Sequence, residues 1–379
     1  MKFILILAVW LSACTALAQK VSTSTVIRDT ESYMSDFQFE RALELLDRAE
    51  DSLDVGILQR RGLCYSRLGN YSDAIVAYEA IRISDSLNRD ALYHLGQLYA
   101  QSEQYDEAKL CYRKLIDLDS TNSFYYKQYA SVSVKANDLV SGIAGYLETV
   151  KFNPRDLEAY GHLAGILIEA EQFHFVDSML TAVLSITESK PLRLLLARAN
   201  LGEDNYQAVI ENVELLLAEG DTTATYARLL GISYFQLDEY KKVIPCMEFL
   251  INAGVKADWM YYYLGVSYQQ TNNPVKGIEF LNRAIEESIS DNIGTYYTQL
   301  AMAYEEVKDF KNAIRHYKAA YETSKADILL YHMARNYDVY YKDKTQAQIY
   351  YKRYLESDDT IKMAKRYSQH RLDVLTDVR

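Results

Sequence analysis

The sequence predicts an all-α fold, a solenoid of about ten helix-turn-helix repeats with one further helix covering its C-terminal end. Three observations predict this fold class. Amphipathic segments, in which apolar residues stand three or four positions apart, follow one another in pairs. The pairs recur with a period close to 34 residues along nearly the whole chain. With only four prolines and fifteen glycines among 379 residues, long disordered stretches are not expected.

Residues 91–120 contain the clearest repeat. The apolar face of its first helix carries Leu92, Leu95, Gly96 and Tyr99. The matching face of its second helix carries Tyr105, Ala108, Tyr112 and Leu115. Small residues on the two faces stand where the helix backbones must approach closely. Because a hairpin with one apolar side cannot bury that side alone, neighbouring repeats are needed to complete the core.

The same template recurs in order along the chain. In the first helices a glycine precedes a tyrosine by three residues, as in Gly62–Tyr65, Gly96–Tyr99, Gly231–Tyr234 and Gly265–Tyr268. In the second helices an aromatic residue, an alanine and a tyrosine recur, as in Tyr71, Ala74 and Tyr78 and in Phe310, Ala313 and Tyr317. Successive repeats begin near Val55, Arg89, Ser123, Leu157, Lys190, Ala224, Asp258, Gly294 and Asp327, and one more precedes Val55. A period this regular indicates a solenoid.

These residues resemble the tetratricopeptide repeat family. Its pattern is Leu-Gly-x-x-Tyr in the first helix and Tyr-x-x-Ala-x-x-x-Tyr in the second, and the resemblance covers roughly residues 23–357. The fifth and sixth repeats depart from it, because Val176 and Val209 stand where the pattern has alanine. The resemblance implies a right-handed superhelix of paired helices that binds peptides or protein partners in its concave groove. It implies no chemistry.

The resemblance also implies which residues line that groove, since the family uses positions 2, 5, 9, 12 and 13 of each first helix. The groove-binding residues carried over are Tyr93, Gln97, Phe124, Lys127, Lys135, Arg228, Phe235, Trp259, Tyr262, Gln269, Tyr331 and Arg335. Aromatic and arginine side chains often carry much of the binding energy of an interface. We expect about half of this set to be exposed. Ser131 replaces the asparagine that a carboxylate clamp of the family requires, so a clamp for a peptide C-terminus is not expected.

Residues 1–18 have the pattern of a secretory signal peptide, with a short basic start, an apolar run and small residues before Gln19. Cleavage after the Ala-x-Ala site would leave Gln19 as the first residue. An alternative is a bacterial lipobox ending at Cys14, which would make Cys14 a lipidated anchor. The sequence therefore predicts an exported, periplasmic chain with the solenoid in residues 19–357 and a capping helix in residues 358–379, anchored to the outer membrane if Cys14 is lipidated.

Charge and motifs argue against several function classes. A net charge of −11 does not favour nucleic acid as the main ligand, since phosphate binding needs clustered basic residues. The chain has no Gly-x-Ser-x-Gly, P-loop, His-Glu-x-x-His or dinucleotide-binding motif, so no enzyme activity, cofactor or metal is expected. His94, His162 and His332 share one repeat position and are interpreted as structural. The basic set near the C-terminus, read either as a contact for an anionic partner or as a solvated face, is Lys362, Lys365, Arg366 and Arg371.

Two smaller features leave alternatives open. Cys64, Cys111 and Cys246 fit small buried residues, although a Cys64–Cys111 bridge between neighbouring repeats is also compatible with the sequence. Gly142 and Gly145, in the second helix of one repeat, indicate either close helix packing or a softer joint.

Asp-Ser or Asp-Thr followed by an aliphatic residue or threonine recurs at the repeat boundaries. The triplet is similar to an O-glycosylation signal of exported proteins in some Gram-negative bacteria, and the hydroxyl residues concerned are Ser52, Ser86, Ser120, Thr222 and Thr360. The alternative is that these are ordinary residues of helix boundaries, where Asp, Ser and Thr are common caps.

The sequence as a whole favours a non-catalytic scaffold of a bacterial cell envelope that binds protein or an extended peptide through its groove. One alternative is a lipid-anchored assembly factor of an outer-membrane or secretion complex. Another is an envelope protein that binds glycan or peptidoglycan through the groove aromatics.

Overall fold

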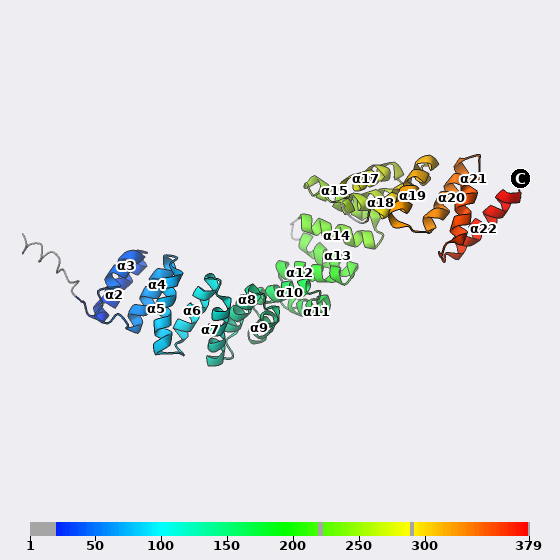
Figure 1. The fold of residues 1–379 in the computed structure, drawn as a ribbon. Coiled ribbons are helices and arrows are strands. Elements are labelled where there is room, and N and C mark those ends of the chain that lie inside the picture. The colour runs from blue at the N-terminus through cyan, green and yellow to red at the C-terminus, as the bar shows by residue number, and fades with distance from the viewer. Residues whose placement is uncertain (1–19, 219–222, 289–291, 378–379) are drawn as a thin grey trace, which may run out of the picture. The chain divides into compact units, whose positions relative to one another are not determined.

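The computed structural model describes residues 20–218, 223–288 and 292–377 (Figure 1). Throughout these ranges the chain is helical, and its β-structure is confined to an isolated bridge between Val21 and Ala49. The predicted signal peptide, the predicted lipidation residue Cys14 and Thr222 lie outside the described residues. Within the described ranges, none of the helices combines the length and apolar character needed to span a bilayer.

The helices form two compact units, of which unit 1 extends to Ala170. Its helices are α2 (Thr23–Ser35), α3 (Phe39–Leu46), α4 (Val55–Arg67), α5 (Tyr71–Ser84), α6 (Arg89–Gln101), α7 (Tyr105–Leu118), α8 (Ser123–Lys135), α9 (Leu139–Phe152) and α10 (Leu157–Glu169). Each helix packs mainly against its neighbours in sequence, so α4 and α5, α6 and α7, and α8 and α9 form successive hairpins (Figure 1).

Unit 2 begins at Glu171. Its first helices are α11 (Phe173–Leu184), α12 (Lys190–Gly202), α13 (Tyr206–Leu217), α14 (Ala224–Gln236), α15 (Tyr240–Asn252) and α16 (Asp258–Gln270). They are followed by α17 (Pro274–Glu287), α18 (Ile293–Glu306), α19 (Phe310–Ser324), α20 (Ile328–Tyr340), α21 (Thr345–Glu356) and α22 (Lys362–Asp377). Hairpins again follow one another along the chain, which confirms the predicted all-α solenoid of helix-turn-helix repeats.

The predicted repeat starts agree with the structure. First helices begin at the predicted residue from Val55 to Asp258, and the last two, α18 and α20, begin one residue away from the predicted Gly294 and Asp327. At α4, α6, α8, α10 and α14 the side chain just before the helix caps its first turn. Asp54 accepts hydrogen bonds from the N–H groups of Gly56 (2.8 Å) and Ile57 (3.2 Å), which are among the unpaired donors of the first turn.

The glycines of the first helices make room for large residues of the second helices. A Cβ atom added to Gly62 would lie 2.4 Å from a ring carbon of Tyr78, and one added to Gly96 would lie 2.8 Å from the ring of Tyr112. Both tyrosines are buried. The recurring pairing of a small residue with a tyrosine is thus a close contact between the two helices of one hairpin.

Gly142 and Gly145 serve the same purpose in α9. A Cβ at Gly142 would meet Val134 at 2.6 Å, and one at Gly145 would meet Cβ of Ala130 at 2.8 Å. The sequence left close packing and a softer joint as alternatives, and these distances favour close packing of α8 against α9.

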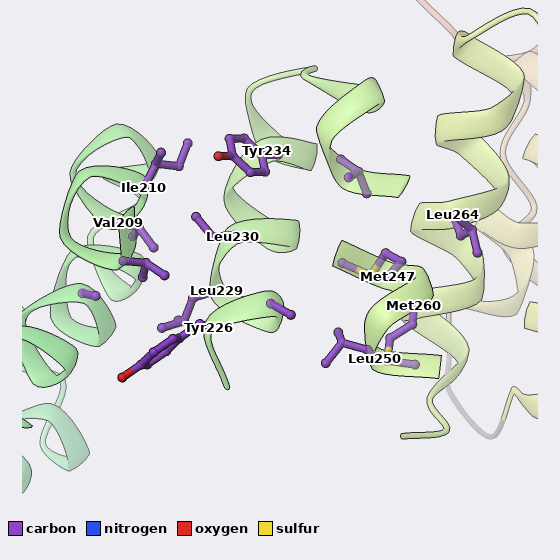
Figure 2. Packing of buried hydrophobic residues seen from close by; sticks show 14 of the residues in the cluster. Val209, Ile210, Tyr226, Leu229, Leu230, Tyr234, Met247, Leu250, Met260 and Leu264 are labelled. Carbon is purple, nitrogen blue, oxygen red and sulfur yellow. The ribbon is translucent and has the colours of Figure 1, made fainter. Parts of the chain in front are cut away.

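Within each unit, buried apolar clusters extend from one hairpin to the next. Figure 2 shows part of it in unit 2, where Val209 and Ile210 of α13 face Leu230 and Tyr234 of α14. Met247 and Leu250 of α15 and Met260 and Leu264 of α16 extend the same cluster. The apolar sides of these hairpins are therefore covered by their neighbours, as a solenoid requires.

The histidines that share one repeat position each stack on a tyrosine of the preceding second helix. The ring centroids are 4.8 Å apart for His94 and Tyr78, 5.5 Å for His162 and Tyr146, and 5.2 Å for His332 and Tyr317. Burial lowers the pKa of His94 and of His332. These stacks agree with a structural role.

Two residues of the predicted basic set, Lys365 and Arg371, form hydrogen bonds that hold α22 against α21 and α20. Lys365 Nζ donates to the carbonyl oxygens of Tyr354 (2.7 Å), Leu355 (3.0 Å) and Ser357 (2.7 Å) at the end of α21. Arg371 binds both carboxylate oxygens of the buried Asp338, at 2.8 and 3.1 Å. The predicted basic face is therefore wrong as one uniform surface, because these two cations are used internally, while Lys362 and Arg366 are exposed.

The three cysteines of the described chain are free thiols. Cys64 and Cys111 are buried and Cys246 is half-buried, and burial raises the pKa of each thiol to about 11. The interpretation as small apolar residues agrees with this, and the Cys64–Cys111 bridge that the sequence left open is not formed.

Candidate functional site

The first-helix face of unit 1 contains two adjoining pockets. The first, of about 330 Å³, is lined by Glu31, Met34, Gln59, Arg60, Leu63, Tyr78, Asp90 and His94. The second, of about 400 Å³, is lined by Leu63, Ser66, Arg67, Tyr71, His94, Gln97 and Gln101. Because both include Leu63 and His94, they form one trough, which we call the unit 1 trough. Of the predicted groove residues, it contains Gln97.

The other residues of the trough were missed by sequence reasoning, but a signal for several of them existed. Gln59, Leu63 and Arg67 stand at positions 5, 9 and 13 of α4, and Asp90 stands at position 2 of α6. The positional rule would have found all four if every groove position of both repeats had been included. His94 was interpreted as structural, and the structure places it in the pocket wall as well as against Tyr78.

Gln97 of the trough lies together with two further predicted residues, Tyr93 and Phe124. Gln97 Nε2 donates to the Tyr93 hydroxyl at 2.7 Å, and the rings of Tyr93 and Phe124 are 5.9 Å apart. Phe124 is 42% exposed. α6 and α8 thus present a combined amide and aromatic surface at the expected groove positions.

Two predicted lysines of unit 1 have different surroundings. Lys127 Nζ lies 3.1 Å from Asp156 and 2.6 Å from Glu158, so it links α8 to the start of α10. The hydrogen bonds of these carboxylates raise the pKa of Lys127 against the opposing effect of burial, which is the larger single influence. Lys135 is exposed.

In unit 2 the predicted groove residues meet in a cluster of aromatic rings. Phe235 stacks on Tyr263 with centroids 3.8 Å apart, and Tyr262 stacks on Tyr296 at 4.9 Å. Trp259 lies edge-on to Tyr263 at 5.5 Å. We call the set the unit 2 aromatic cluster, and its members are Phe235, Tyr240, Trp259, Tyr262, Tyr263 and Tyr296. Sequence reasoning missed Tyr240, Tyr263 and Tyr296.

Arg228 extends this cluster. Its guanidinium carbon lies 5.7 Å from the ring centroid of Trp259, a cation–π distance, and its side chain is exposed. Trp259 and Tyr262 are half-buried, so each is held by its neighbours and still reaches the surface. Such a surface can bind apolar and aromatic groups, or a planar group stacked on Trp259.

The remaining predicted groove residues, Gln269, Tyr331 and Arg335, contact other side chains of the protein. Gln269 is 4% exposed and its amide nitrogen donates to Glu306 at 2.8 Å. Arg335 lies over the ring of Tyr331 at 5.6 Å and 3.6 Å from Glu305. The Tyr331 ring also contacts Tyr367 of α22.

The four described triplet hydroxyls, Ser52, Ser86, Ser120 and Thr360, are all exposed. In each case the preceding aspartate accepts a hydrogen bond from the N–H group two residues later, at 2.9 Å for Leu53, 3.1 Å for Leu87, 3.3 Å for Thr121 and 2.8 Å for Ile361. The aspartates therefore have a structural use as turn residues. The hydroxyl groups stand on accessible turns.

In the part of the chain that the structure describes, no group of three or more His, Cys, Asp or Glu side chains is placed to hold a metal ion.

Comparison with known proteins identifies individual repeats. The family model described as tetratricopeptide repeat matches residues 90–122 and 294–327, which correspond to α6–α7 and α18–α19. None of the curated proteins is detectably similar in sequence.

Solved structures with a similar chain path are distant in sequence. A tetratricopeptide repeat protein from Parabacteroides merdae ATCC 43184 is 15% identical, with a TM-score of 0.44 over 66% of this chain and 98% of that one. The Naa15/Naa10 complex bound to HypK-THB is 13% identical, with a TM-score of 0.49 over 88% of this chain and 58% of that one. YrrB, described as a tetratricopeptide repeat protein with an unusual peptide-binding site, is 14% identical, with a TM-score of 0.36 over 68% of this chain and 97% of that one.

The two matched repeats lie in different units, and the hairpins around them share their period, their helix starts and their contact between small and large residues. The chain therefore contains tetratricopeptide repeats, with one matched repeat in each unit.

Proposed function

We propose that this protein is an exported, non-catalytic scaffold that binds an extended peptide or the surface of a protein partner through its first-helix face. The tetratricopeptide repeat fold suggests a protein-binding scaffold. The main support for binding at this face is the unit 2 aromatic cluster with Arg228 beside it. Trp, Tyr and Arg are the residues enriched at binding hot spots.

The rings of this cluster are ordered before any partner arrives. Tyr262 is held by its stack on Tyr296, whose hydroxyl group donates to Asp258 at 3.1 Å. A side chain already held in place loses little conformational freedom on binding, so more of the contact energy contributes to affinity. A preformed surface of this kind favours a partner that adapts to it, such as an extended segment.

The test is a crosslinked pull-down from the native envelope with the Trp259→Ala/Tyr262→Ala double variant beside wild type. We expect a protein that wild type recovers to be lost with the double variant. Phe175→Ala is the matched control, because Phe175 is an exposed aromatic residue of unit 2 outside the cluster. Equal recovery by wild type and a folded double variant would contradict the proposal.

The glycan-binding alternative rests on the same half-exposed rings, because aromatic faces also stack on sugars. Sedimentation of the purified protein with isolated cell wall separates the two. Binding to cell wall that is lost with Trp259→Ala, without any protein partner in the pull-down, would replace the peptide with a glycan.

Export and anchoring are proposed from the sequence of residues 1–18. Fractionation of cells expressing wild type and Cys14→Ser decides between the two processing routes. A protein found free in the periplasm in both cases indicates cleavage before Gln19. Membrane association that is lost with Cys14→Ser indicates the lipid anchor and the assembly-factor alternative.

We propose the exposed turn residues Ser52, Ser86, Ser120 and Thr360, together with Thr222, as glycosylation sites. Intact mass measurement of the native protein tests this.

A further inference from the structure

The unit 1 trough has one unpaired charge of each sign. Asp90 lines the first pocket and Arg67 lines the second. Neither forms an ion pair with another described residue, whereas the neighbouring Arg60 is already paired with Glu31. Both side chains are exposed, so both charges are available to a ligand.

The shared wall of the two pockets fixes the order of these charges. Leu63 and His94 belong to both pockets, while Asp90 belongs only to the first and Arg67 only to the second. Asp90 precedes His94 by four residues on α6, and Arg67 follows Leu63 by four residues on α4. Each step is roughly 6 Å along a helix. The charges therefore stand on either side of a less polar centre, on the order of 15 Å apart.

Besides the two charges, the trough offers groups suited to a peptide backbone. Gln59 and Gln101 line the two pockets with amide side chains, which can donate to carbonyl groups and accept from N–H groups. The side chain of Leu63 and the ring of His94 form an apolar strip at the centre, and His94 is held there by its stack on Tyr78.

We propose that the unit 1 trough binds an extended peptide segment that carries one basic and one acidic side chain about five residues apart, with the basic group at Asp90 and the acidic group at Arg67. The spacing follows because an extended chain advances roughly 3.3 Å per residue. This inference rests on the proposed function and names the chemistry of the partner at one part of the face. Segments carrying two charges of the same sign place one of them against a like charge and bind more weakly.

The test measures fluorescence anisotropy of three labelled ten-residue peptides with blocked ends and a serine–alanine spacer, added to the purified full chain at low salt. The peptides carry Lys and Glu, two Lys, or two Glu, in each case five residues apart. Wild type is expected to bind the Lys/Glu peptide about three- to tenfold more tightly than the other two. Arg67→Glu is expected to shift the preference to the two-Lys peptide, and Asp90→Lys to the two-Glu peptide.

Matched controls show whether the peptide preference depends on the charge inside the trough or on the net charge of the protein. Arg155→Glu changes the net charge as Arg67→Glu does, on an exposed arginine outside the trough. Asp106→Lys matches Asp90→Lys, because Asp106 occupies the first turn of α7 as Asp90 occupies that of α6. Both controls are expected to keep the wild-type preference.

Equal binding of the three peptides, no binding of any, or the same shifts in the controls would overturn the inference. If that happens while Trp259→Ala/Tyr262→Ala still abolishes the envelope pull-down, the proposed function stands and only the chemistry assigned to the trough is wrong. If the pull-down is also unaffected, the proposed function fails as well.

Discussion

At the scale of single residues, a tyrosine–glutamate hydrogen bond links consecutive repeats in three places. The hydroxyl group of a first-helix tyrosine donates to a glutamate of the preceding second helix, 20 residues earlier in the chain. The distances are 2.8 Å for Tyr99 and Glu79, 3.2 Å for Tyr234 and Glu214, and 2.6 Å for Tyr268 and Glu248. The template tyrosine therefore contributes both buried ring area and a polar contact between repeats.

This contact predicts a pH dependence that Tyr234 carries. Burial, together with the Glu214 carboxylate, raises the pKa of the Tyr234 hydroxyl from 10.0 to about 12. Because the folded state holds this proton more tightly, the stabilisation is complete below pH 10 and is lost as the pH rises toward 12. At pH 8, Tyr234→Phe should lower the free energy of unfolding by about 1 kcal/mol. Urea unfolding should show this difference shrinking above pH 10, and a constant difference up to pH 11.5 would contradict the assignment.

At the scale of helices, α8 and α9 pack closely because Gly142 and Gly145 of α9 have no side chain at the contact. Gly145→Ala should lower the free energy of unfolding by about 1–3 kcal/mol, because the new Cβ would lie 2.8 Å from Cβ of Ala130 and 3.2 Å from its backbone. Gly165→Ala in α10 is the matched control, since a Cβ there meets nothing within 4 Å. The control should gain up to ~1 kcal/mol of helix propensity. Thermal unfolding of both variants checks this, and a stabilised Gly145→Ala would show that the joint is soft.

The last helix depends on one buried carboxylate. Arg371→Ala would leave Asp338, which is 7% exposed, without its two strongest hydrogen bonds, although Lys344 and the Tyr351 hydroxyl remain near it. We expect a loss of about 1–3 kcal/mol, expressed as faster amide hydrogen exchange throughout α22. Arg366→Ala, which removes an exposed arginine from the same helix, should leave the exchange unchanged. Equal exchange in the two variants would mean that apolar packing alone holds the helix.

At the scale of the whole molecule, period and template residues predicted the repeats, because each hairpin repeats the same local contacts. Side-chain partners between repeats could not be predicted in the same way. Lys127 is a groove position by rule, yet it pairs with Asp156, 29 residues later, because α8 and the start of α10 bring them together. Arg371 was read as part of a basic surface, yet it binds Asp338, 33 residues earlier. Such pairings depend on side-chain direction, which a single sequence does not specify.

In the unit 2 aromatic cluster, too, some residues could be predicted from their repeat positions and others could not. Phe235, Trp259 and Tyr262 followed from their positions in the first helices. Tyr240 begins a second helix, and Tyr263 stands at position 6, outside the five groove positions of a first helix. The positional rule therefore did not predict either residue. Their rings nevertheless complete the cluster, because Phe235 reaches across from α14 to stack on Tyr263 and to contact Tyr240.

Photo-crosslinking in the native envelope shows whether the first-helix face holds the partner. A benzophenone amino acid is placed at Tyr262 in one strain and at Phe249, an exposed aromatic residue of the second helix α15, in another. We expect a discrete crosslinked protein from position 262 that is absent from position 249. The same adduct from position 249 alone, or equally from both positions, would contradict it and place the contact on the second-helix face.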